Sequence, residues 1–282
     1  MPTVKIDGIA TRYEVIGSGA PLLMFSPGGF DATLEKWSTL GVYAKTKMMA
    51  TLTANFQCIV FDRRETGHSG GRVQRVTWAD FVVQGKGLLD HLGIAKAHLM
   101  GGCMGCAPVV AFAAMHPGAT RSVVLYWPVG GAKYRINGQQ RFAQHLAYVQ
   151  QEGLTAVLAL AQASSKSFAE DPRAGPWVSV LRSDPPFAAA FAAMDLESYK
   201  LAVVATQRAL LDRDTAPGAE PEELLRLNVP ALIVPGKDNS HATSAARYLE
   251  ECLAGSEYWD LLPADQVEAN VPARLLQFLN AH

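Results

Sequence analysis

The sequence predicts an α/β protein built on a mostly parallel sheet of about eight strands, with helices on both faces. Three observations support this prediction. Short apolar runs alternate with helical patterns in both terminal parts of the chain, and several runs stop at glycine-rich turns. Between residues 131 and 227, helical patterns alone replace the alternation. We therefore expect a three-layer core of residues 1–130 and 228–282, into which a helical cap of residues 131–227 is inserted.

The expected strands are short apolar runs bounded by turn residues. The first two form a hairpin around Gly8, and the later ones are apolar throughout, as strands buried on both faces are. The runs cover Thr3–Asp7, Ile9–Val15, Pro21–Ser26, Phe56–Phe61, Ala97–Gly101, Val123–Trp127, Ala231–Val234 and Tyr258–Leu262.

Helical periodicity fills the segments between these strands. Thr77 is the expected N-cap of one helix, and Gly93 follows its end. The expected helices cover residues 34–54, 78–91, 107–115, 196–211 and 272–279, and a further helix ends near residue 253.

Composition favours a small-molecule substrate or ligand as the partner. The formal net charge is −1 and 18% of residues are charged, so no basic face indicates nucleic-acid binding. The N-terminus lacks a basic segment followed by an apolar one, and glycines and a proline interrupt the longest apolar run, Leu99–Met115. We therefore expect no signal peptide and no membrane span. Four cysteines are too few for a disulfide scaffold, which favours the cytoplasm. We expect no cofactor and no metal, and a homodimer is one open oligomeric state.

The segment Gly101-Gly102-Cys103-Met104-Gly105 lies between an expected strand and an expected helix. Read as Gly-x-nucleophile-x-Gly, it is a sharp turn in which small residues let strand and helix pack closely. A thiol at a helix N-terminus is stabilised as thiolate by the free N–H groups and the helix dipole. The alternative interpretation is a glycine-rich turn with inert, buried cysteines.

The order of the motifs resembles the α/β-hydrolase family. An Asp-x-Arg-x-x-Gly-x-Ser loop precedes the turn at Cys103, and a late strand ends in Gly-x-Asp. The residues that carry the resemblance are Asp62, Arg64, Gly67, Ser69, Gly101, Cys103, Gly105, Gly236 and Asp238. The resemblance implies that Cys103 attacks an acyl carbon, and that backbone N–H groups of Met104 and of the Gly28–Gly29 segment hold the oxyanion. Within the family, cysteine at this position is typical of dienelactone hydrolases and polyester-forming acyl transferases, whereas the cap resembles those of epoxide and C–C hydrolases.

Aromatic residues near and within the expected cap are candidates for an apolar substrate pocket. Trp127, Phe142, Tyr148 and Trp177 would line it, and His145 could reach it from the helical face that it shares with Phe142. The alternative is that these side chains form the ordinary core of the cap.

The chain departs from the family pattern at two places. Glu65 stands where the family usually has a glycine, and we expect it to be a solvated loop residue. The loop after the last strand, residues 263–270, normally carries the catalytic histidine and here contains none. His282 lies beyond the last helix, where chain ends fray.

The position of each remaining histidine narrows the search for a base. Catalytic groups in a parallel sheet gather at the carboxyl ends of the strands. His98 begins the strand that Cys103 follows, roughly 16 Å away, and His91 and His116 end helices that run back toward the same far side. The histidines left are His68, His145 and His241.

His241 is the predicted base, because it follows the Asp238 loop at the carboxyl end of a strand. Asp238 is close enough in sequence to orient its imidazole. The alternative is that His241 only caps the following helix. His68 lies in a surface-type loop, and His145 is the next candidate.

The predicted function is hydrolysis of a small, largely apolar ester, lactone or thioester, or of a C–C bond, through an acyl group on Cys103. Three alternatives stay open. They are an acyltransferase, a non-catalytic ligand-binding protein on a hydrolase scaffold, and a thiol–disulfide protein that uses Cys103 and Cys106 as a Cys-x-x-Cys pair.

Overall fold

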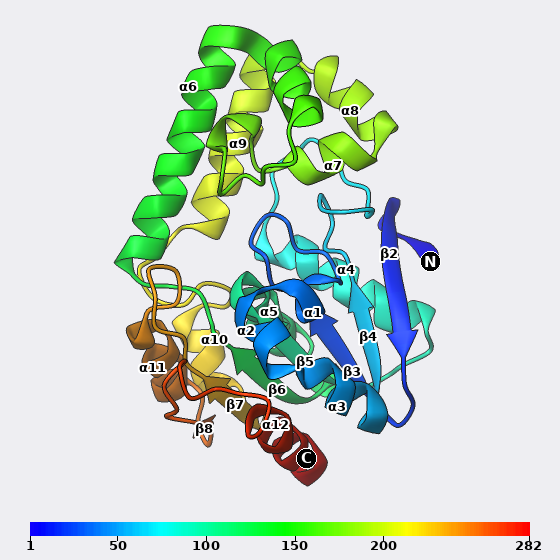
Figure 1. Cartoon of the computed structure of the whole chain (residues 1–282), viewed down its shortest axis with the longest axis vertical. Coiled ribbons are helices and arrows are strands. Elements are labelled where there is room, and N and C mark those ends of the chain that lie inside the picture. The colour runs from blue at the N-terminus through cyan, green and yellow to red at the C-terminus, as the bar shows by residue number, and fades with distance from the viewer.

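The computed structural model describes residues 1–282 and contains one eight-stranded sheet, as the sequence predicts (Figure 1). The spatial order is β1-β2-β4-β3-β5-β6-β7-β8, with antiparallel pairing at β1–β2 and β2–β4 and parallel pairing elsewhere. The strands are β1 Thr3–Ile6, β2 Ile9–Ile16, β3 Ala20–Phe25, β4 Phe56–Phe61, β5 Ala97–Gly102, β6 Thr120–Tyr126, β7 Ala231–Val234 and β8 Glu257–Tyr258.

The register brings the carboxyl ends of the central strands to one edge. Phe25 of β3 pairs with Gly101 of β5, and Gly102 pairs with Tyr126 of β6. Tyr126 in turn pairs with Val234 of β7. The loops that leave β3, β5, β6 and β7 therefore start side by side, and a site at this edge can use residues from all four.

Each face of the sheet is buried beneath its own layer of helices. Successive residues of a strand point to opposite faces, so Leu23 and Phe25 belong to one apolar cluster and Leu22 and Met24 to the other. The first face carries α4 Trp78–His91, α5 Cys106–Met115, α10 Pro221–Arg226 and α11 Thr243–Cys252. The second carries α1 Lys36–Thr39, α2 Gly41–Thr46, α3 Met48–Asn55 and α12 Val271–Ala281.

Several boundaries differ from the expected ones for local reasons. The continuous helix expected over residues 34–54 is three short helices, because Leu40 is extended and Lys47 is left-handed, with φ 47°. Strand β8 is shorter than expected, and residues 259–262 leave the sheet. Thr77 is the N-cap of α4, where its side chain and that of Asp80 exchange hydrogen bonds with each other's backbone N–H groups.

A helical insertion stands on the carboxyl edge of the sheet between β6 and β7 (Figure 1). It contains α6 Ala132–Ala163, which is interrupted at Gly153, and α7 Val178–Ser183, α8 Pro185–Ala192 and α9 Leu196–Leu210. Helix α10 contacts α5 and α11 of the core instead. The part of the insertion above the sheet therefore ends near Leu211, before the expected boundary at 227.

Short 3-10 helices cover Cys103–Gly105, Pro117–Ala119 and Pro172–Ala174. No helix has the length and apolar character needed to cross a membrane.

Candidate active site

Cys103 lies at a strained turn between β5 and the helix that follows it. Its φ is 53°, a left-handed value that costs free energy for a residue with a side chain. The flanking glycines are required by close packing. A Cβ at Gly105 would lie 2.2 Å from the carbonyl oxygen of Phe25, and one at Gly101 would lie 2.4 Å from that of Gly105. The turn thus projects the Cys103 thiol beyond the end of the sheet, while Met104 and Gly105 are buried.

Three groups around Cys103 favour its thiolate. Burial raises the pKa of the thiol, but the neighbouring His241 and the backbone N–H groups of Met104 and Gly28 outweigh burial, and the pKa is lowered. The two N–H groups are those expected to hold an oxyanion. Gly29, the second residue of the expected segment, uses its carbonyl to accept a hydrogen bond from Arg63.

His241 and Asp238 form a close pair on the loop after β7. Nδ1 of His241 lies 2.8 Å and 2.9 Å from the two carboxylate oxygens of Asp238. Asp238 also accepts from the backbone N–H groups of Ser240 at 2.8 Å and His241 at 3.0 Å. Ala242 is the N-cap of α11, so the His241 side chain does not cap that helix. The carboxylate therefore orients the ring, with the Nδ1–H directed at Asp238 and Nε2 on the opposite side of the ring.

Nε2 of His241 is buried and has no hydrogen-bond partner of good geometry, although the ring lies close enough to Cys103 for each group to shift the pKa of the other. Burial lowers the pKa of His241, but the Cys103 thiolate and Asp238 together raise it to about 10. The hydrogen bond from His241 lowers the pKa of Asp238 to about 2. These directions describe a thiolate, an imidazolium and a carboxylate in series.

The loop after β8, where the family's histidine is expected, carries a buried Gln266. Its Oε1 accepts from the Tyr126 hydroxyl at 2.8 Å and from Nε1 of Trp127 at 2.7 Å, and its Nε2 donates to the carbonyl groups of Pro235 and Leu261. Trp127 packs against His241, with ring centroids 5.4 Å apart. Sequence reasoning missed Gln266, because nothing in its local sequence signals contacts with residues so far along the chain.

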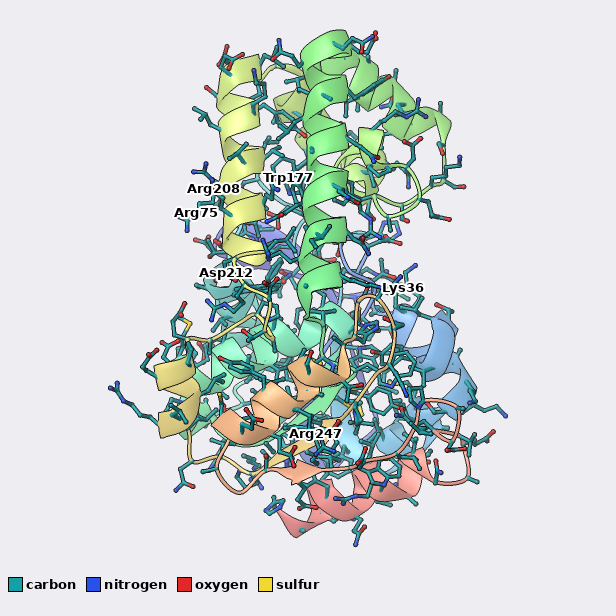
Figure 2. All side chains as sticks on the ribbon, turned by 90° about the vertical axis from the view of Figure 1, so that its left-hand side faces the viewer. Lys36, Arg75, Trp177, Arg208, Asp212 and Arg247 are labelled. Carbon is teal, nitrogen blue, oxygen red and sulfur yellow. The ribbon has the colours of Figure 1, made fainter.

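A cavity of about 530 Å³ opens above Cys103, between the core and the insertion. The core contributes Gly28, Cys103 and Met104, and the insertion contributes Tyr134, Arg141 and Phe168. Lys36 also lines it and lies where the insertion meets the core (Figure 2). The cavity is large enough for a small organic molecule whose acyl carbon reaches the thiol.

Comparison with known proteins identifies the family. The model of the alpha/beta hydrolase fold matches residues 21–239, well over half of the chain. The chain belongs to this family.

Solved structures with the same fold cover almost the whole chain. The enol-lactonase from Burkholderia xenovorans LB400 is 22% identical, covers 99% of this chain and 100% of its own, and superposes with a TM-score of 0.62. The meta-cleavage product hydrolase CumD from Pseudomonas fluorescens IP01 is 16% identical over 100% and 98% of the two chains, with a TM-score of 0.62. The esterase RhEst1 from Rhodococcus sp. ECU1013 is 20% identical over 99% and 98%, with a TM-score of 0.62. No curated protein matches the chain. At these identities the likeness shows the fold.

The expected pocket aromatics are mostly elsewhere in this α/β hydrolase. Phe142 is fully buried between Phe30 and Phe168, with ring centroids 5.6 Å and 5.2 Å away. Tyr148 lies under the Arg173 guanidinium. Trp127 packs on His241 and Gln266. Neither these three nor His145 line the cavity above Cys103, because helical spacing shows which residues share a face but not what that face packs against.

Trp177 lies within the insertion between α6 and α9 (Figure 2) and packs on Tyr199. Together with Arg63 it lines a separate cavity of about 20 Å³, which shares Gly29, Phe30 and Met104 with the main cavity.

His145 is a neutral core residue of the insertion. Its Nδ1 donates to the carbonyl of Arg173 at 2.8 Å, and its Nε2 accepts from the Tyr199 hydroxyl at 2.6 Å. Burial lowers its pKa to about 4. His68, by contrast, is exposed in its loop, as expected.

Glu65 is buried, which contradicts its expected place in solvent. It is 3% exposed and takes a left-handed conformation with φ 60°, the conformation that a glycine would adopt freely. Its carboxylate accepts from Nε of Arg64 at 2.9 Å and 3.0 Å and from the N–H of Arg72 at 3.3 Å. Burial raises its pKa. The Arg64 partner is what allows a carboxylate at this position.

Cys106 differs from Cys103 in every respect that governs thiol reactivity. It is buried beneath the turn, and its thiol donates to the carbonyl of Gly101 at 3.1 Å. Burial, with the Cys103 charge, raises its pKa well above the ordinary value. The two cysteines are unbonded in the structure. Cys106 is thus a small residue that packs the strand against the helix.

Proposed function

We propose that the protein is a hydrolase that cleaves a small, largely apolar ester, lactone or thioester through an acyl group carried on Cys103. The observation that carries this proposal is the convergence on one thiol of the Asp238–His241 pair, two backbone N–H groups and a cavity of about 530 Å³. The helical insertion acts as the cap of this site, since it contributes Tyr134, Arg141 and Phe168 to the cavity lining.

The first half of the reaction forms the acyl-enzyme. In the resting site the thiol proton lies on His241, which Asp238 holds, and the Cys103 thiolate attacks the acyl carbon. The N–H groups of Met104 and Gly28 stabilise the negative oxygen that forms. Removal of one such donor typically costs ~10²–10³ in rate. When the intermediate collapses, the C–O or C–S bond to the leaving group breaks and His241 returns the proton to that group.

The second half releases the product. Water enters the cavity, and His241 takes one of its protons as the water oxygen attacks the carbonyl carbon of the thioester. A second oxyanion forms at the same N–H groups, and its collapse gives a carboxylic acid and the free thiol. The water molecule is the only co-reactant consumed.

The direct test is detection of the acyl group on Cys103. The intact protein is mixed with 4-nitrophenyl butyrate and with butyryl thioesters, quenched within seconds, and analysed by mass spectrometry. We expect turnover and a butyryl adduct on the Cys103 peptide. Cys103→Ala should remove both, whereas the matched variant Cys106→Ala should retain most of the activity. Transfer of butyryl groups to added alcohols in preference to water would favour an acyltransferase, and equal loss in both variants would favour dithiol chemistry.

A further inference from the structure

The inner end of the cavity contains hydrogen-bond donors that have no partner. The hydroxyl of Tyr134 is buried, lines the cavity beside Cys103 and makes no hydrogen bond. Arg141, from the same helix, lines the cavity and forms no ion pair. Arg135 of that helix is instead paired with Asp214, Nε to Oδ1, at 2.6 Å. A buried donor without a partner is costly, and a ligand atom can supply the missing acceptor.

A further positive charge lies behind the cavity wall. Arg63 is 1% exposed, and its Nε and Nη1 atoms have no hydrogen-bond partner. Its Nη2 donates to the carbonyl of Gly29, and its guanidinium stacks on Phe81 at 5.1 Å. Gly29, Phe30 and Met104 line both the main cavity and the small one beside Arg63. The Arg63 guanidinium is therefore close enough to interact electrostatically with Cys103 and Tyr134, which line the main cavity.

The other charged groups of the cavity lining already have partners. Lys36 is paired with Asp31 at 2.9 Å, so these two charges cancel. The carboxylate of Glu170 accepts from the backbone N–H and the hydroxyl of Ser167 at 2.8 Å and 2.7 Å. Glu170 keeps its negative charge, and Glu65 lies near Arg63. What distinguishes Arg141 is therefore its lack of a partner. Of the cationic side chains that line the cavity, Lys36 is ion-paired and Arg141 is not.

We propose that the natural substrate carries a free carboxylate in addition to the bond that is cleaved, and that Tyr134 and Arg141 bind this carboxylate. The inference rests on the proposed hydrolase function and narrows its substrate class to half-esters, or lactones, of dicarboxylic acids. The carboxylate would accept from the Tyr134 hydroxyl and the Arg141 guanidinium, with Arg63 adding attraction through the wall. The bonds broken and formed at Cys103 are those of ordinary hydrolysis. A half-ester therefore gives a dicarboxylic acid and an alcohol, and a lactone gives a single hydroxy-dicarboxylic acid.

The test compares two substrates that differ only in charge. Monomethyl glutarate has a free carboxylate, dimethyl glutarate is neutral, and methanol release is measured for both. We expect the kcat/KM ratio of monoester to diester to be at least tenfold for the wild type. Arg141→Gln should lower this ratio at least tenfold, and Tyr134→Phe should lower it about fivefold. The matched control Arg135→Gln removes one charge from the same helix and should leave the ratio unchanged. A wild-type preference for the neutral ester, or an unchanged ratio in both cavity variants, would overturn the inference.

A binding measurement separates this inference from the proposed function. The Cys103→Ala protein is titrated with monomethyl glutarate and dimethyl glutarate, and its melting temperature is recorded. We expect the free acid alone to raise Tm, and Arg141→Gln in this background to abolish the shift. A Tm shift in Cys103→Ala, together with a wild-type protein that hydrolyses no ester, would refute the hydrolase while keeping the carboxylate subsite. Turnover of esters without any shift by the acid would refute the subsite while keeping the hydrolase.

Discussion

His241, in the loop after β7, and His145, in helix α6, are both largely buried imidazoles with opposite electrostatic surroundings. Nδ1 of His241 faces the carboxylate of Asp238, and its other side faces Cys103, so its pKa rises to about 10. His145 contacts a carbonyl and a hydroxyl, both uncharged, and its pKa falls to about 4. Burial penalises the charged form of both rings, and the presence or absence of anionic partners decides whether the pKa rises or falls.

The comparison predicts that loss of His241 has the largest effect on activity. His241→Asn removes the proton acceptor and the positive charge that stabilises the thiolate. We expect kcat/KM for 4-nitrophenyl butyrate to fall by about 10²–10⁴, the usual contribution of a general base. His68→Asn is the control, since His68 is exposed. Full activity of His241→Asn would show that the helix N-terminus alone activates the thiol.

The pH dependence of Cys103 alkylation sharpens the same contrast. The lowered pKa of Cys103 means that the thiolate persists below the pH at which a free thiol is protonated. Iodoacetamide should therefore label Cys103 faster than an ordinary thiol at neutral pH, and the rate should fall as the pH drops through the lowered pKa. His241→Asn should move this inflection upward, and once the pKa lies above 7 each further unit lowers the thiolate fraction at pH 7 by about tenfold. An inflection that is the same in both proteins would contradict the ion pair.

His145 should influence stability instead of chemistry. Between pH 6.5 and about 4 the unfolded chain binds a proton at this residue and the folded protein does not, so stability is lost as pH falls through this window. The full contribution is on the order of 3 kcal/mol, because one pKa unit corresponds to ~1.4 kcal/mol. Urea unfolding at pH 7 and pH 4.5 should show a smaller loss for His145→Gln than for the wild type. The loss that remains is expected from His98, which burial affects in the same way. An identical loss in His145→Gln would refute a neutral His145.

The parts that the sequence predicted correctly depend on local patterns. Apolar runs and turns determine the strands, and the Asp238–His241 contact spans only three residues, so both could be inferred without the tertiary structure. The turn at Cys103 likewise follows from two nearby glycines.

The parts that the sequence did not predict depend on long-range packing. The aromatic residues of the insertion were assigned to the wrong environment because their partners, such as Phe30 for Phe142, come from distant segments. Glu65 was expected in solvent because its burial requires the Arg64 side chain to turn inward beside it. Gln266 forms hydrogen bonds to Tyr126 and Trp127, about half the chain away, and no local periodicity indicates such contacts.

Gln266→Leu is expected to lower the rate much less than His241→Asn, and it tests how His241 is held. Gln266→Leu keeps a side chain of similar size but leaves the Tyr126 hydroxyl and the Trp127 indole N–H without their acceptor. Each unsatisfied buried donor costs about 1–3 kcal/mol, so the variant should be less stable. Because Trp127 packs on His241, we also expect a fewfold lower kcat and an upward shift of the Cys103 alkylation inflection.

A control in the same loop separates positioning from general loosening. Asn270 accepts from the backbone N–H of Val267 at 3.0 Å and donates to the carbonyl of Asp265 at 2.9 Å, and it touches neither Trp127 nor Tyr126 through hydrogen bonds. Asn270→Ala should therefore lower stability and leave the alkylation inflection in place. If Gln266→Leu also leaves the inflection in place at a temperature where the protein is fully folded, Gln266 supports only the fold. If it moves the inflection and Asn270→Ala does not, then the loop that lacks the expected histidine still acts on the site, through the orientation of Trp127 against His241.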